Sequence, residues 1–219
     1  MKIIAAISLI IFATAMKPIK KNRIVFFGDS ITQMGIDKGG YIDRMNSMLH
    51  QRNLQDKFDL IGAGISGNKV YDLYLRMPED VMDKKPNTVV IWVGVNDVWH
   101  KTSGTGTDLD KYEKFYIAII RKLQQKKINV VVTTPATIGE KSDGTNPQDA
   151  DLDKYSDVIR RLATTYHCKL VDLRSVFINY EKMHNTQNKE SGILTTDRVH
   201  LNDSGNQVVA EEMMKAIVD

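Results

Sequence analysis

Several residues in the chain have the types and spacing needed for acyl transfer. Ser30 stands just after a short apolar run, and Asp197 precedes His200 by three positions. With two residues between them, an aspartate can fold back onto Nδ1 of the imidazole, which leaves Nε2 free to take a proton from a serine. Gly67 and Asn96 each follow a further apolar run. The set therefore offers a nucleophile, a base, an orienting acid and polar donors.

The segments that must position these residues alternate between two patterns. Apolar runs typical of buried strands occupy residues 24–27, 58–61, 88–93, 128–133 and 169–173. Apolar residues at helical spacing predict helices over residues 41–50, 69–82, 107–127, 150–166 and 204–218, with a less regular stretch before Asp197. This alternation predicts a single-domain three-layer α/β/α sandwich with a mostly parallel, doubly wound sheet of about five strands. Because parallel strands end at one edge, Ser30, Gly67 and Asn96 should emerge there together.

The turn around Ser30 has a second interpretation. Asp29 or Ser30 could merely cap a helix that starts after the first strand. The turn also lacks the Gly-x-Ser-x-Gly elbow of the commoner serine hydrolases, because Thr32 stands where the second glycine would be. The nucleophile interpretation is favoured because the other polar groups each supply something that an attacking serine requires.

The first residues and the charge bear on where the protein works. A basic start precedes an apolar run over residues 3–15 with a small-residue ending, which is typical of a signal peptide cleaved after Ala15. We therefore expect residues 1–15 to be removed and residues 16–219 to form a secreted or periplasmic domain. An uncleaved anchor or a buried first helix is the alternative. The run is too short for a stable membrane span, and a formal net charge of +3 without basic blocks argues against nucleic acid.

No metal or organic cofactor is expected. The paired aspartates at Asp108 and Asp110 and the series from Asp149 to Asp153 stand at expected helix starts, where carboxylates favour the helix dipole. The glycine and distant glutamate of a calcium-binding loop are missing. Cys168 is the single cysteine, so an intramolecular disulfide is excluded.

Four motifs, in this order, resemble the blocks of the SGNH/GDSL hydrolase family of esterases, lysophospholipases, thioesterases and carbohydrate O-acetylesterases. The matching segments are Gly28-Asp29-Ser30-Ile31-Thr32, Gly64-Ile65-Ser66-Gly67-Asn68, Gly94-Val95-Asn96-Asp97 and Asp197-Arg198-Val199-His200-Leu201-Asn202. Each motif alone occurs in many proteins, but together they bracket nearly the whole mature chain. Ile31 replaces the leucine of the family name, and Gly62 stands where many members have an asparagine.

The resemblance implies a flavodoxin-like sheet and a role for each matched residue. Ser30 would be the nucleophile, His200 its general base and Asp197 the partner that orients the base. The oxyanion hole would comprise the backbone N–H of Ser30, the backbone N–H of Gly67 and the side-chain amide of Asn96. Losing one such donor typically slows acyl transfer about 100- to 1,000-fold.

Alternatives remain for the oxyanion donor of the second block and for the substrate. Gly64 is the alternative to Gly67, which is preferred as the last glycine of its block. Candidate substrate-pocket residues are Asp29, Trp99 and Val199. Small polar residues in the loops 102–107 and 137–149 favour an open cleft.

We therefore expect a secreted or periplasmic serine esterase for short-acyl or acetyl esters, carried by a small molecule or a carbohydrate. A lysophospholipase or thioesterase with the same triad is the alternative for longer acyl chains. A non-catalytic binding domain on this fold is the remote alternative, and it would lack a nucleophile, base or oxyanion residue.

Overall fold

Five parallel strands form the centre of the molecule. A computed structural model describes residues 21–218, so the signal peptide expected over residues 1–15 lies outside the described residues. The strands are β1 Asn22–Gly28, β2 Phe58–Gly64, β3 Thr88–Trp92, β4 Asn129–Thr133 and β5 Lys169–Val171. They lie in the order β2-β1-β3-β4-β5, and every neighbouring pair is parallel. The predicted doubly wound sheet is confirmed.

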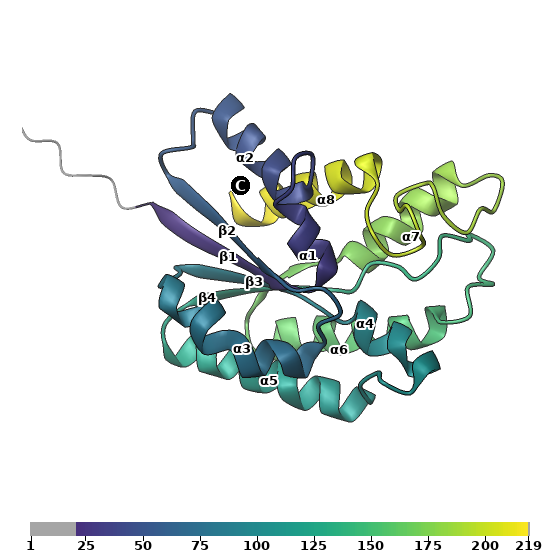
Figure 1. Ribbon diagram of the computed structural model, residues 1–219, viewed down its shortest axis with the longest axis horizontal. Helices are drawn as coiled ribbons and strands as arrows, with labels where there is room; N and C mark the ends of the chain where they lie inside the picture. The colour runs from purple at the N-terminus through teal and green to yellow at the C-terminus, as the bar shows by residue number, and fades with distance from the viewer. Residues whose placement is uncertain (1–20, 219) are drawn as a thin grey trace, which may run out of the picture.

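Helices cover both faces of the sheet. They are α1 Ser30–Gly35, α2 Tyr41–Gln51, α3 Val70–Asp80, α4 Val95–Trp99, α5 Leu109–Gln125, α6 Asp149–Thr165, α7 Leu173–His184 and α8 Asp203–Ile217, with short 3₁₀ turns at η1 Met82–Lys84 and η2 His100–Ser103. Figure 1 shows α2 and α8 over one face and α3, α5 and α6 over the other, which gives the three predicted layers. Within residues 21–218 no helix is both long and apolar enough to cross a membrane.

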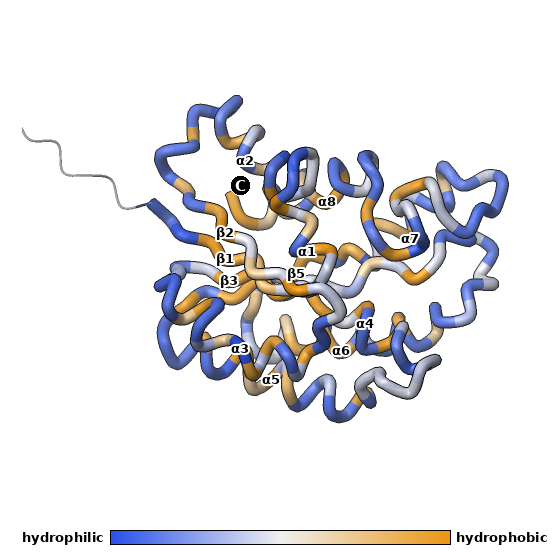
Figure 2. The backbone as a smooth tube through the Cα atoms, viewed as in Figure 1, coloured by the Kyte–Doolittle hydropathy of each residue, from blue (hydrophilic) through white to orange (hydrophobic). Residues whose placement is uncertain are grey.

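Phe26 and Phe27 show how β1 is buried on both sides. Phe26 packs edge-to-face on Tyr41 of α2, with ring centroids 5.8 Å apart. On the other face, the Arg76 guanidinium of α3 lies 4.6 Å from the centre of the Phe27 ring. Figure 2 shows apolar residues along the strands and hydrophilic residues on the outer helices. Burial on both faces explains why β1 is one continuous apolar run.

The register of the central strands fixes the edge at which the polar motifs emerge. Gly28 at the end of β1 pairs with Gly64 of β2 and with Trp92 of β3. The segments that carry Ser30, Gly67 and Asn96 therefore leave the sheet side by side, at the edge where open α/β sheets hold their ligands.

The stretch after β5 was expected to be irregular, which is wrong for its first part and correct for residues 185–202, where there is no helix. The first part forms α7, which begins after Asp172, whose side chain accepts a hydrogen bond from the backbone N–H of Ser175. The buried residues of α7 include charged Arg174 and Glu181 beside Leu173 and Phe177. A buried face that is half charged gives no apolar periodicity, so the sequence pattern concealed this helix.

Two helix ends have unusual features. Pro78 lies inside α3, two residues before that helix ends. At the start of α5, Asp108 is the N-cap residue without a side-chain cap, and Thr107 before it is buried.

Candidate active site

Ser30 lies where β1 gives way to α1. The strand ends at Gly28, and Asp29 is the N-cap residue of α1, with its Oδ1 accepting a hydrogen bond from the backbone N–H of Ile31 at 3.0 Å. Ser30 is thus the first residue of the helix and is 8% exposed. The capping role falls to Asp29, which leaves the Ser30 hydroxyl free for another partner.

That partner is His200, which in turn contacts Asp197. Ser30 Oγ lies 2.9 Å from His200 Nε2, and His200 Nδ1 lies 2.7 Å from Asp197 Oδ2. The structure therefore brings together three side chains whose first and last members are 170 positions apart. A nucleophile hydrogen-bonded to a base, with the base oriented by a third group, is the arrangement that activates a hydroxyl for attack.

Asp197 also shapes the turn that carries the histidine. Its Oδ1 accepts hydrogen bonds from the backbone N–H groups of Val199 at 3.1 Å and His200 at 2.8 Å. Partial burial would raise the pKa of Asp197, but the hydrogen bonds from His200 and these backbone groups outweigh it and hold the pKa below its usual value. Asp197 is therefore suited to remain a carboxylate that orients the imidazole and stabilises its protonated form.

A buried glutamate holds the segment that leads into this turn. Glu140 is fully buried, and its carboxylate accepts hydrogen bonds from the backbone N–H groups of Ile193, Leu194 and Thr195 at 2.8, 2.6 and 2.7 Å. Three hydrogen bonds to one charged group are strong restraints on a loop. The position of Asp197, two residues further on, thus depends on a side chain from the loop after β4.

The glycine block and the asparagine block are joined to each other by two hydrogen bonds. Asn96 Nδ2 donates to the carbonyl of Asn68 at 3.1 Å, which fixes the amide and leaves its second N–H available. Asp97 is fully buried and accepts from the backbone N–H of Val70 at 3.2 Å, at the start of α3. The two loops are therefore held as one unit beside Ser30.

Gly64 and Gly67 differ in what their backbones do. A Cβ on Gly64 would collide with the backbone of Thr32 and Gln33, so Gly64 is needed for α1 to pack closely on β2. Gly67 has a left-handed φ of +75° and open space around its Cα, and within residues 21–218 its N–H meets no acceptor. Gly67 therefore offers a free backbone donor in open space.

The sequence departs from the family pattern at Gly62 and Ile31, and packing explains both differences. A side chain at Gly62 would collide with Ile36, which packs over β2 in the space that a larger residue would occupy. Support for the glycine block comes instead from Arg76 on α3, which donates to Asn68 Oδ1 at 2.6 Å and to the carbonyls of Gly28 and Ala63 at 2.7 and 3.0 Å. Ile31 is buried, as a leucine would be.

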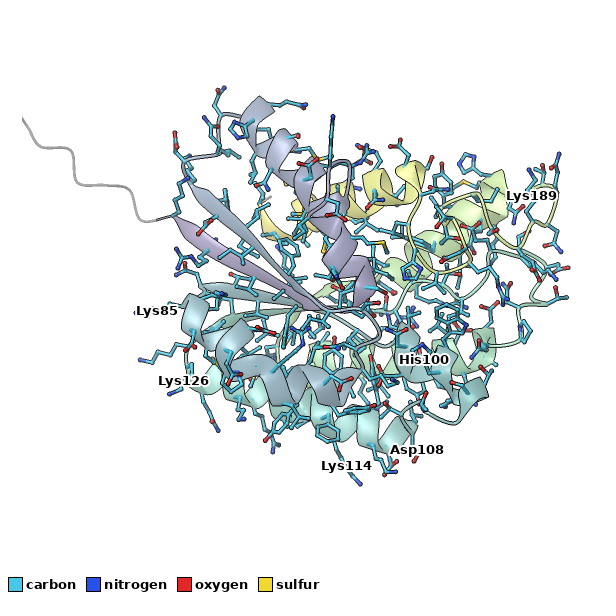
Figure 3. The ribbon with its side chains drawn as sticks, viewed as in Figure 1. Lys85, His100, Asp108, Lys114, Lys126 and Lys189 are labelled. Atoms are coloured by element: carbon cyan, nitrogen blue, oxygen red, sulfur yellow. The ribbon has the colours of Figure 1, made fainter. Side chains whose placement is uncertain are left out.

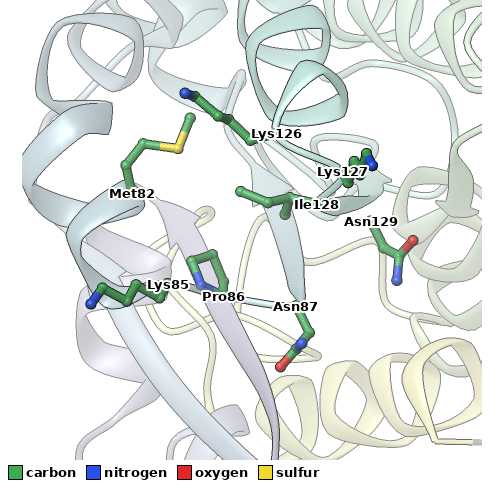
Figure 4. A pocket seen from close by; sticks show the side chains of 8 residues that line it. All are labelled: Met82, Lys85, Pro86, Asn87, Lys126, Lys127, Ile128 and Asn129. Carbon is green, nitrogen blue, oxygen red and sulfur yellow. The ribbon is translucent and has the colours of Figure 1, made fainter.

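A hollow of about 300 Å³ opens beside the Ser30 hydroxyl. Its lining residues are Ser30, Gln33, Met34, Ser66, Thr196, Asp197 and His200. A larger hollow of about 580 Å³ lies at the opposite edge of the sheet, where residues of the loops before β3 and β4 line it (Figure 4). Figure 3 shows the two ends of the molecule, with Lys85 and Lys126 at that far edge and His100 near the end that carries Ser30. The larger hollow has lysine, amide and apolar side chains and no nucleophile–base pair, so the chemistry points to the smaller one.

The remaining expected pocket residues, Asp29, Trp99 and Val199, do not line the hollow. Asp29 and Val199 are each 3% exposed, and Trp99 is half-buried against the core and tilted against His100. Burial raises the pKa of Asp29 to about 7, with the nearby Asp97 carboxylate adding to the effect of burial. Asp29 and Val199 thus support the site from within.

Gln33, Arg76 and Glu140 are site residues that sequence reasoning missed. Gln33 Oε1 accepts a hydrogen bond from the backbone N–H of Ser66 at 2.6 Å, which joins α1 to the glycine block. The sequence carries one weak signal, since Gln33 follows Ser30 at helical spacing. Arg76 and Glu140 act on backbone groups remote in sequence, and no local motif marks them.

In the part of the chain that the structure describes, no group of three or more His, Cys, Asp and Glu side chains is placed to hold a metal ion.

Comparison with known proteins agrees with this geometry. Residues 26–208 match the sequence model of the GDSL-like Lipase/Acylhydrolase family. An acetylxylan esterase of Geobacillus stearothermophilus is 27% identical over 213 residues, which are 90% of this chain and 94% of that protein. Among solved structures, an acetyl xylan esterase named AlAXEase is 56% identical with a TM-score of 0.89, covering 90% of this chain and 100% of its own. LAE5, an alpha/beta hydrolase from the metagenome of Lake Arreo in Spain, is 29% identical with a TM-score of 0.79, covering 90% and 95%.

Proposed function

The chain belongs to the GDSL-like lipase/acylhydrolase family and is a carboxylic ester hydrolase, and from this premise we propose that it removes acetyl groups from carbohydrate hydroxyls through an acyl-enzyme on Ser30. The observation that carries the proposal is the hydrogen-bonded series Ser30–His200–Asp197, with distances of 2.9 and 2.7 Å, beside a small open hollow. Two relatives that are acetylxylan esterases support an acetylated polysaccharide as the substrate class.

In the first half of the reaction, Ser30 Oγ attacks the carbonyl carbon of the ester and transfers its proton to His200 Nε2. The carbonyl π bond becomes an oxyanion, which receives hydrogen bonds from the N–H groups of Ser30 and Gly67 and the free N–H of Asn96. The intermediate collapses with cleavage of the bond to the sugar oxygen. His200 returns the proton to that oxygen, so the alcohol leaves neutral and Ser30 remains acetylated.

In the second half, water replaces the alcohol. His200 Nε2 takes one proton from the water as its oxygen attacks the acetyl carbon, and the same donors bind the oxyanion. Collapse breaks the bond to Ser30 Oγ, which regains its proton from His200, and acetate is released. Asp197 keeps Nδ1 protonated throughout and stabilises the imidazolium that forms twice in each cycle.

The shape and lining of the hollow support a short acyl group. Of the residues that line it, Met34 is apolar, and the others present hydroxyl, amide, carboxylate or imidazole groups. A long acyl chain needs a large apolar surface, since each buried CH₂ contributes about 0.8 kcal/mol. An open hollow of about 300 Å³ offers little such surface, and its hydroxyl and amide groups suit a sugar whose remaining hydroxyls need hydrogen-bond partners.

A panel of esters tests this function. We expect kcat/KM for 4-nitrophenyl acetate to exceed that for the octanoate and palmitate esters, and acetate to be released from acetylated xylo-oligosaccharides. The Ser30→Ala variant, with an unchanged circular dichroism spectrum, should release no acetate above background. Faster turnover of long-chain esters or lysophospholipids than of acetyl esters would contradict the proposal and favour the lysophospholipase alternative.

A further inference from the structure

Arg198, inside the turn between Asp197 and His200, has a backbone conformation that arginine rarely adopts. Its φ is +84°, in the left-handed region that favours glycine. The conformation is held from both sides, because its N–H donates to Thr195 Oγ1 at 3.2 Å and its carbonyl accepts from the N–H of Gly139 at 2.8 Å. Such a strained residue at a functional site is a reason to ask what its side chain does.

The side chain of Arg198 has no hydrogen-bond or ion-pair partner among residues 21–218. Its Nε is buried without a hydrogen bond, and within residues 21–218 its guanidinium forms no ion pair. The Nε atom lies 3.7 Å from the place where a Cβ on Gly139 would be, so the guanidinium stem crosses the loop after β4 at a residue with no side chain. Strain and an unsatisfied donor both disfavour arginine here, and a simple structural role explains neither.

The acidic side chains of the two adjoining loops are occupied elsewhere. Asp197 is bonded to His200, and Asp149 to Arg174 at 2.9 Å. Glu140 accepts hydrogen bonds from three backbone N–H groups, and Glu190 forms an ion pair with Lys141 at 3.3 Å. None of these carboxylates pairs with Arg198, so its guanidinium is available to a molecule that binds at this edge.

We propose that Arg198 binds the carboxylate of a uronic acid carried by the acetylated oligosaccharide that the enzyme deacetylates. The planar guanidinium presents paired N–H donors that match the two oxygens of a carboxylate. Arg198 does not line the hollow itself, but it lies in the turn between Asp197 and His200, which do, so a carboxylate bound to it belongs to a neighbouring part of the oligosaccharide whose acetyl group occupies the hollow beside Ser30. The inference rests on the proposed function and narrows its substrate class to acidic acetylated xylan-type chains.

The test measures binding, separately from hydrolysis. Unacetylated xylo-oligosaccharides with and without a glucuronic acid branch are titrated into the full-length protein, its Arg198→Gly variant and its Lys127→Gly variant. Lys127 is a matched control, because it is also a basic residue with a left-handed φ, +59°, and lines the hollow at the far edge of the sheet. The wild type and Lys127→Gly should bind the acidic oligosaccharide about tenfold more tightly than the neutral one, and Arg198→Gly should lose this preference.

Thermal unfolding separates recognition from a structural role. Glycine relieves the left-handed conformation, so Arg198→Gly should melt at or above the wild-type temperature. A melting temperature several degrees below wild type would indicate a structural role and overturn the proposal. Equal affinity of the wild type for the two oligosaccharides, or an unchanged preference in Arg198→Gly, would also overturn it. The release of acetate from neutral acetylated xylo-oligosaccharides reports independently on the proposed function.

Discussion

The side-chain amide of Gln33 joins the helix of the nucleophile to the loop of Gly67. Its Oε1 accepts a hydrogen bond from the backbone N–H of Ser66 at 2.6 Å, so the residue that precedes Gly67 is tied to α1. Gln33 lies three positions after Ser30 along that helix, and both residues line the same hollow. The position of one oxyanion donor relative to the nucleophile thus depends on one side chain.

Replacing Gln33 should slow the chemical step more than it weakens binding. Gln33→Met keeps the length of the side chain but removes the acceptor for Ser66, so the Gly67 N–H is no longer held in place. We expect kcat for 4-nitrophenyl acetate to fall about tenfold, less than the loss of an oxyanion donor outright, with a smaller change in KM. Gln51→Met, at an exposed position that ends α2, should keep the wild-type kcat. A wild-type kcat in Gln33→Met would show that the loop holds its position without this contact.

Arg76 should contribute substantially to stability. Its side chain is 14% exposed and donates to the carbonyls of Gly28 and Ala63 at the ends of two strands. Arg76→Met would leave these carbonyls without that donor, and we expect the free energy of unfolding to fall by about 2–4 kcal/mol in urea titrations. Arg161→Met, which removes an exposed ion pair with Glu113, should cost less than about 1 kcal/mol. Equal losses in the two variants would contradict this role for Arg76.

Glu181 should make the fold less stable as the pH rises. It is 3% exposed, and burial, with Glu140 and Asp149 nearby, raises its pKa from the ordinary value of 4.5 to about 8. The folded state therefore binds this proton more tightly than the unfolded state. The stabilising effect of the protonated form is complete below pH 4.5 and is lost as the pH rises toward 8.

Glu181→Gln keeps the neutral form at every pH and should remove this loss. Urea titrations between pH 4 and pH 9 should show that the variant gains stability relative to the wild type as the pH rises, on the order of a few kcal/mol at the upper end. Glu79→Gln, at an exposed position of α3, should follow the wild-type curve. Parallel curves for wild type and Glu181→Gln would mean that Glu181 is ionised in the folded protein at neutral pH.

The sheet was predictable because its strands have a local signature. Strands buried on both faces must be continuous apolar runs, and residues 88–93 and 128–133 contain β3 and β4 within one residue at each end. The helix α7 was missed because buried Arg174 and Glu181 interrupt its apolar face. Charged residues can be buried there because other parts of the chain supply their partners. The local sequence pattern does not predict these partners.

The residues of the site also fall into two groups, those that the sequence indicates and those that only the fold brings into place. Ser30, Gly67, Asn96, Asp197 and His200 each stand in a short motif beside a strand end or a helix start, so the sequence alone indicates them. Gln33 and Glu140 are recognisable only after folding, because their partners lie 33 and at least 53 positions away. A surface glutamine or a loop glutamate has no feature in the sequence that distinguishes it from its many equivalents.

The signal peptide expected over residues 1–15 can be tested on the exported protein. When the full chain is expressed in a bacterial host, we expect mass spectrometry of the periplasmic or secreted fraction to give a mature N-terminus at Met16. Replacing Ala15 with a bulky residue should block processing, because signal cleavage requires small residues at that position. Recovery of the uncleaved chain in a membrane fraction would favour the anchor alternative.

The most direct test of the account asks which atom carries the acyl group. A fluorophosphonate probe should label the wild type once, with the adduct on the peptide that contains Ser30. Ser66→Ala is the matched control, because Ser66 lines the same hollow but has no histidine partner, and it should still be labelled at Ser30. Ser30→Ala, folded by circular dichroism, should not be labelled. Labelling of Ser30→Ala, or an adduct mapped to Ser66 in the wild type, would contradict the assignment of Ser30 as the nucleophile.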